Sequence, residues 1–261
     1  MSLRLGQAFG DGIRRVLTRS GAVLFVALLI IQFLIQAAVN TAVLGLLPPG
    51  AASQTGGMLG LTLPISATAA GGLLLVAMVV SSAYFVAMAR ALARPVPELG
   101  RFPSSLYTRR IGRATLSVIG GGFLVGLAVS VGLALLILPG IYLGACFLFF
   151  LFEVSVEDER AISALKTSWA RTKGDRLKLA VIVLLGGVVG AVVGAVGSVL
   201  DVLGSPLASE VVVNTLSTAL FVALYGIMAD AYVQARGEDQ GGLGGTGTAT
   251  PADGGVAADR S

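Results

Sequence analysis

The sequence contains no histidine and only one cysteine, Cys146. Histidine is the commonest general base near neutral pH and a common metal ligand, so its absence excludes most zinc-hydrolase and Ser-His protease mechanisms. A single cysteine forms no intrachain disulfide, and its thiolate is disfavoured inside an apolar run. No P-loop, GxSxG or paired-carboxylate motif is present either. We therefore expect a protein that is not an enzyme and has no catalytic residue, metal or cofactor.

Charge is also scarce. Only 12% of the 261 residues are charged, against about 25% in soluble proteins, whereas 55% are hydrophobic. The apolar residues form long runs, and a helix needs roughly 20 of them to cross the hydrocarbon core of a bilayer. We therefore predict an all-α polytopic membrane protein with six transmembrane helices. Their predicted bounds are Gly21–Leu47, Gly71–Ala91, Ala114–Leu138, Ile141–Val154, Leu179–Leu203 and Val211–Val233.

The third and fourth of these helices belong to one apolar run of about 40 residues, twice the length of one crossing. Pro139 and Gly140 lie near its middle, where a chain reversal is expected. Unpaired backbone at the bilayer centre is costly, so we place this reversal at the far surface of the membrane. The six helices then form three hairpins.

Of the 18 Lys and Arg residues, 17 lie before the first, between the second and third, between the fourth and fifth, or after the sixth predicted helix, and Arg90 is the last residue but one of the second. By the positive-inside rule, these segments and both termini face the cytoplasm, and the protein lies in the cell membrane. The opposite side carries only Asp201 and Glu210 as charged residues. The net charge of +4 sits beside apolar runs, which suits anionic lipid head groups and not nucleic acid.

Three parts are expected along the chain. Residues 1–20 are predicted to be an amphipathic cytoplasmic segment and residues 21–236 the transmembrane domain. Residues 237–261 are rich in Gly, Thr and Ala with no apolar periodicity, and we predict a disordered cytoplasmic tail there.

Residues 157–173 are predicted to form an amphipathic helix on the membrane surface, with an acidic first turn and a basic end. Trp169, the only tryptophan, would lie at head-group depth, with Arg171 and Lys173 near anionic phosphates. We favour this lipid-lying connector over the alternative, a helix that docks a membrane or cytoplasmic protein partner.

Three amides, Gln32, Gln36 and Asn40, recur every four residues and so share one stripe of the first predicted helix. In lipid this stripe must face protein or a water-filled cavity. We favour hydrogen bonding between helices, and the alternative is the lining of a polar path.

Small residues recur in the same way on the fifth predicted helix, at Gly186, Gly190, Gly194 and Ser198. Such ladders allow close helix packing, which we expect within one chain and not between two copies. The oligomeric state stays open.

Four short motifs carry a family resemblance. In chain order they are Leu138-Pro139-Gly140-Ile141-Tyr142-Leu143, Glu153, Ala164-Leu165-Lys166-Thr167-Ser168-Trp169 and Thr172-Lys173-Gly174. In these residues the chain resembles six-helix membrane-domain families typified by the glycerophosphodiester phosphodiesterase membrane domain. The low Lys and high Arg, Ala, Val and Gly usage is compatible with a prokaryote of high GC content, such as a haloarchaeon. The resemblance implies a fold and no catalytic residue, because the hydrolytic domain fused to such membrane domains is a separate soluble one.

The expected function is that of a non-enzymatic scaffold or a factor in envelope and lipid homeostasis. The alternative is a small-solute or ion transporter with a polar path near Gln32, Gln36 and Asn40.

Overall fold

The computed structural model describes residues 4–57, 59–100 and 103–244. Within these ranges the chain is helical without strands, and six helices are long and apolar enough to cross a membrane. The predicted all-α fold with six long apolar helices is therefore confirmed. The six are α2 (Arg19–Leu46), α4 (Ala67–Leu92), α6 (Ile111–Leu135), α7 (Ile137–Cys146) with α8 (Phe150–Val156), α10 (Arg176–Val202) and α11 (Pro206–Gly244).

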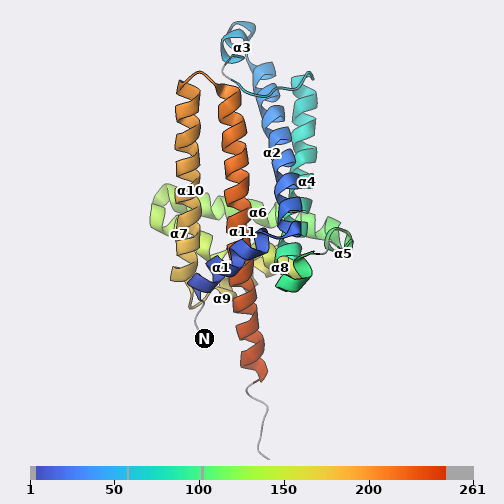
Figure 1. The fold of residues 1–261 in the computed structure, drawn as a ribbon, viewed down its shortest axis with the longest axis vertical. Coiled ribbons are helices and arrows are strands. Elements are labelled where there is room, and N and C mark those ends of the chain that lie inside the picture. Colours follow the sequence, from blue (N-terminus) through green and yellow to red (C-terminus); the bar gives the residue numbers. More distant parts are fainter. Residues whose placement is uncertain (1–3, 58, 101–102, 245–261) are drawn as a thin grey trace, which may run out of the picture.

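Four of these helices stand side by side, and one hairpin crosses them. Figure 1 shows α2, α4, α10 and α11 upright, with α6 and α7 running across their lower half. The upright helices pack as α2 with α4, α10 with α11, and α11 with α2. The hairpin attaches through α7 to α10 and through the first part of α6 to α4.

The reversal between α6 and α7 differs from the prediction in two respects. The break is at Leu136, and Pro139 lies in the first turn of α7, where a missing backbone N–H is tolerated. The hydroxyl of Tyr142 accepts a hydrogen bond from Arg176, the first residue of α10. The reversal therefore lies toward the end where α10 begins, and not at the far surface.

The fourth predicted helix is interrupted between α7 and α8. The carbonyl of Cys146 accepts hydrogen bonds from the hydroxyls of Ser168 and Thr172, at 3.0 and 3.4 Å. This carbonyl bonds to Ser168 of α9 (Ala161–Arg171) and to Thr172 just after it, and the chain makes a short turn before α8 begins at Phe150.

The short helices gather mainly at one end, with α1 (Leu5–Val16) lying across α11. Gly12 marks this crossing, because a Cβ there would lie 2.5 Å from the Cα of Ile227. A larger residue at position 12 would push the two helices apart. The remaining short elements are α3 (Pro49–Thr55), η1 (Val96–Gly100) and α5 (Ser105–Thr108).

Two predicted boundaries need correction. The amphipathic helix begins at Ala161 and not at Glu157, because two acidic residues before it are engaged elsewhere. Glu157 pairs with Arg236, and Asp158 has φ +55° and pairs with Arg90. The sixth long helix continues to Gly244, so residues 237–244 of the predicted tail are helical. Residues 245–261 lie outside the described residues.

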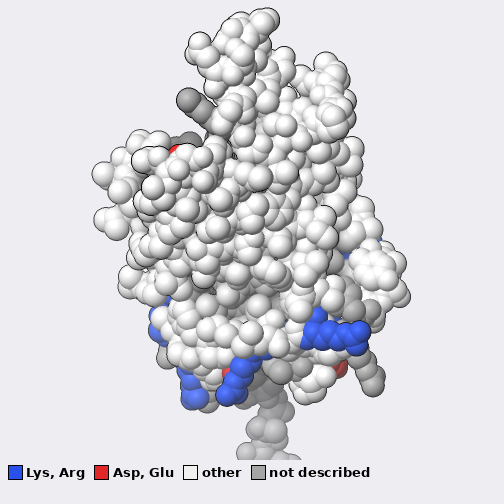
Figure 2. All heavy atoms as spheres, turned by 45° about the horizontal axis from the view of Figure 1, so that its top comes forward, with Lys and Arg blue, Asp and Glu red and all other residues white. Residues whose placement is uncertain are grey.

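Buried arginines join the helices at one end of the molecule. Arg15 pairs with Asp230 at 3.0 Å and donates to the carbonyl of Leu92, which ties α1, α4 and α11 together. Arg90 pairs with Asp158 at 3.1 Å. Figure 2 shows Lys and Arg gathered at this end of the visible face, and we call it the basic end.

Candidate functional site

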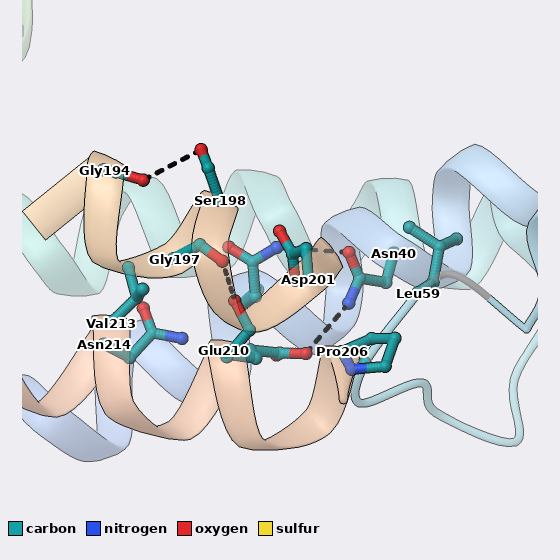
Figure 3. A pocket seen from close by; sticks show the side chains of 13 residues that line it. Asn40, Leu59, Gly194, Gly197, Ser198, Asp201, Pro206, Glu210, Val213 and Asn214 are labelled. Atoms are coloured by element: carbon teal, nitrogen blue, oxygen red, sulfur yellow. Dashed lines mark hydrogen bonds between the residues drawn. The ribbon is translucent and has the colours of Figure 1, made fainter. Parts of the chain in front are cut away.

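A polar cavity of about 320 Å³ opens at the end of the molecule opposite the basic end. It lies between α2, α10, α11 and the loop that precedes α4, as Figure 3 shows. The side chains that line it include two carboxylates, three amides and two hydroxyls, and no Lys or Arg. These polar residues are Gln36, Asn40, Ser198, Asp201, Ser209, Glu210 and Asn214.

Glu210 is the best-defined group in the polar cavity. Its Oε2 accepts hydrogen bonds from the backbone N–H of Leu61 at 2.7 Å and from Nδ2 of Asn40 at 3.5 Å. Its Oε1 is buried and has no hydrogen-bond partner among the described residues. A buried carboxylate oxygen without a donor is costly, so this atom favours a ligand that brings a proton donor or a positive charge.

The amides of α2 are placed by a chain of hydrogen bonds. Gln36 Nε2 donates to Oδ1 of Asn40 at 3.1 Å, and Asn40 Nδ2 donates to the carbonyl of Leu61 at 2.9 Å. Asn40 therefore joins α2 to the loop at Leu61 and to Glu210 of α11. This is the kind of hydrogen bonding that we favoured for the stripe. Gln36 and Asn40 also line the cavity, whereas Gln32 is half-buried and is not among its lining residues.

An apolar cavity of similar volume, about 320 Å³, lies nearer the basic end on the seam of α10 and α11. Its lining is aliphatic and aromatic apart from Ser217, and Phe9 and Ile13 of α1 close it toward the basic end. Such a lining suits a hydrocarbon chain.

The two cavities follow one stripe of each helix. On α10, Gly190 lines the apolar cavity and Gly194, four residues later, lines the polar one. On α11, Ser217 lines the apolar cavity and Val213, four residues earlier, lines the polar one. Residues four apart lie on one face of a helix, so the cavities succeed each other along a single seam. We call this succession of the two cavities the α10–α11 slot.

The predicted glycine ladder forms the wall of this slot. A Cβ on Gly186 would meet Leu224 of α11 at 3.0 Å, whereas a Cβ on Gly190 or Gly194 would meet nothing within 4 Å. The packing prediction is therefore wrong for Gly190 and Gly194. Because these positions lack a side chain, they leave space between the helices instead of closing it.

The three residues predicted for the membrane surface have different environments. Trp169 is 39% exposed, and the guanidinium of Arg176 lies 4.5 Å from its ring centroid. Lys173 is exposed. Arg171 points inward: it pairs with the fully buried Glu153 at 3.1 Å and lies 5.3 Å from the ring centroid of Tyr232. Its predicted contact with lipid phosphates is therefore wrong, because a buried carboxylate binds its charge.

Sequence reasoning singled out the amides of α2 but missed what they face. Glu210 and Asn214 are four residues apart on α11, which is the same spacing that drew attention to the stripe on α2. That signal was available. The approach of α10, which brings Ser198 and Asp201 to the same cavity, is a tertiary contact that no local pattern announces.

Comparison with known proteins gives a family and no activity. No curated protein and no solved structure matches the chain. Residues 3–235 match the model of a family described as Domain of unknown function (DUF7847). Because this match spans most of the 261 residues, the chain belongs to the DUF7847 family.

Proposed function

We propose that this protein is a non-enzymatic membrane protein that binds an amphiphilic lipid in the α10–α11 slot and acts in envelope or lipid homeostasis. The observation that carries the proposal is the succession of a polar, acidic cavity and an apolar cavity along one seam. An amphiphile has the same succession of chemistry along its length.

The polar cavity supports a head group with an amine or several hydroxyl donors. Asp201 and Glu210 supply negative charge without a Lys or Arg in the lining, and Glu210 Oε1 has no donor among the described residues. Charge-assisted hydrogen bonds from an ammonium group to such a carboxylate are about twice as strong as neutral ones.

The apolar cavity supports the hydrocarbon part of the same ligand. Gly190 leaves room in the wall, and Phe221 and Leu224 of α11 offer the opposite apolar surface. Each buried methylene stabilises binding by about 0.8 kcal/mol, so a chain of several carbons adds appreciable affinity.

A polar path for small solutes has less support. The hydrophilic lining includes Gln36 and Asn40 but not Gln32, and the cavity that follows toward the basic end is apolar. A hydrated solute would have to shed its water in that apolar part, which is costly for a charge. A scaffold that only holds partner proteins apart would not need the open space beside Gly190 and Gly194.

Two further assignments accompany the proposal. The basic end faces the cytoplasm of a prokaryotic cell membrane, which the distribution of Lys and Arg supports. Kinship with the glycerophosphodiester phosphodiesterase membrane domain, and an origin in an organism such as a haloarchaeon, rest on sequence resemblance and residue usage.

The slot is tested by filling it. We expect the full chain, extracted in mild detergent, to retain lipids that native mass spectrometry detects, and Gly190→Leu to lower their occupancy at least tenfold. Position 190 accepts a Cβ without a clash, so the variant should fold. Gly187→Leu is the matched control, because Gly187 has equally open surroundings on α10 but lines neither cavity.

The polar end has its own variant. Glu210→Gln keeps the shape of the side chain and removes its charge, so the retained lipids should shift away from amine-bearing head groups. Equal lipid occupancy in the parent, Gly190→Leu and Gly187→Leu chains would contradict the proposal.

A further inference from the structure

A third cavity, of about 300 Å³, lies at the basic end, far from the α10–α11 slot along α11. It is formed by the end of α4, the helix α5, the end of α8 and one residue of α11. Its lining contains four arginines and no Asp or Glu, and it shares no residue with either cavity of the slot. The four are Arg90, Arg94, Arg109 and Arg236.

Arg90 makes the frame of this arginine cavity. It is 8% exposed, and it donates to the carbonyls of Ser155 at 2.7 Å, Leu106 at 3.2 Å and Arg109 at 2.7 Å. These bonds join α4, α5 and α8, so the wall is held in place before any ligand arrives. Preorganised walls reduce the ordering cost of binding.

The charges of Arg90, Arg109 and Arg236 are only partly balanced by carboxylates outside the lining. Asp158 pairs with both Arg90 and Arg109, and Glu157 pairs with Arg236 at 2.9 Å. One carboxylate thus serves two guanidiniums. Arg109 and Arg236 keep 62% and 40% of their side chains exposed, so their donors remain accessible from the cavity mouth.

We propose that the arginine cavity is a binding site for a phosphate group. Planar guanidiniums offer paired N–H donors that match phosphate oxygens, and several of them around one cavity neutralise a dianion. The cavity lies where α4 ends, at the boundary between apolar helix and charged loops. A phosphate at this boundary can come from a lipid head group or from a soluble compound, and both have the required chemistry.

The test uses the full chain in detergent and isothermal titration calorimetry. Pyrophosphate probes the soluble source and short-chain phosphatidic acid the lipid source, with short-chain diacylglycerol as the lipid that lacks phosphate. We expect at least one phosphate probe to bind, and Arg109→Gln with Arg236→Gln to weaken its binding at least tenfold. Binding by phosphatidic acid alone assigns a head-group site, and binding by pyrophosphate assigns a site open to soluble anions.

The matched control is Arg110→Gln with Arg160→Gln, which removes the same charge from exposed residues outside the lining. Its affinity should stay within twofold of the parent chain. An equal loss in both double variants, or no binding by either phosphate probe, would overturn the proposal. If the cavity double variant does not fold, Arg109→Gln alone gives the same comparison against Arg110→Gln.

Discussion

At the residue scale, the basic end depends on buried charges with partners on other helices. Glu153 of α8 is fully buried, and Arg171 of α9 reaches it at 3.1 Å while lying over the ring of Tyr232. A buried ion pair of this kind holds two elements in one arrangement, and removal of one partner leaves the other as an uncompensated buried charge.

Arg171→Met is therefore expected to destabilise the protein by about 3–5 kcal/mol, because Glu153 would remain buried and charged. The double variant Glu153→Leu with Arg171→Met should recover most of this loss, since neither charge is then buried. Thermal unfolding of the purified chain in detergent measures both. A double variant that is less stable than Arg171→Met would contradict this expectation, because removing both charges would then not restore stability.

At the element scale, the hairpin of α6 and α7 is the least expected part of the fold. Length and composition allow both helices to cross a membrane. Yet the middle of α6 lies against α8 and α9, because a Cβ on Gly121 would meet Phe150 at 2.2 Å and Ala161 at 3.2 Å. Figure 1 shows the hairpin across the four upright helices. The reversal at Leu136 therefore lies away from the end that carries the polar cavity.

Cysteine labelling checks this placement. In a Cys146→Ser background, we expect Ala208→Cys to react with a membrane-impermeant thiol reagent added from the side of the polar cavity. The native Leu136 is 69% exposed, but a cysteine at this position, Leu136→Cys, should not react with reagent added from that side. Equal reaction of the two cysteines would show that the hairpin reaches the same surface as the α10–α11 turn.

At the scale of the whole molecule, the charge asymmetry predicts how the chain is oriented in a membrane. On the face that Figure 2 shows, the described Lys and Arg residues lie at the basic end, and the opposite end carries Asp201 and Glu210. Because moving Lys and Arg across a membrane is unfavourable, the basic end should face the cytoplasm.

Reporter fusions give the expected readout. An enzyme that is active only outside the cytoplasm should be active when fused after Ala52 or Ala208, and inactive when fused after Gly241. Activity after Gly241 together with inactivity after Ala208 would reverse the orientation.

The sequence by itself determined the class of the protein and the number of its long helices. These follow from local quantities, namely the length of an apolar run against the thickness of a bilayer and the distribution of Lys and Arg between runs. The stripe of Gln36 and Asn40 was also readable, because residues four apart share a face whatever surrounds the helix.

The tertiary structure alone decided what each face meets. The same spacing that suggests close packing at Gly190 and Gly194 becomes the open wall of a slot, because α11 approaches α10 elsewhere along the seam. Arg171 of α9 turns from lipid toward Glu153 for a similar reason, since α8 presents a buried carboxylate to it. Spacing fixes which residues share a face, and only the packing of the helices fixes whether that face is filled, charged or left open.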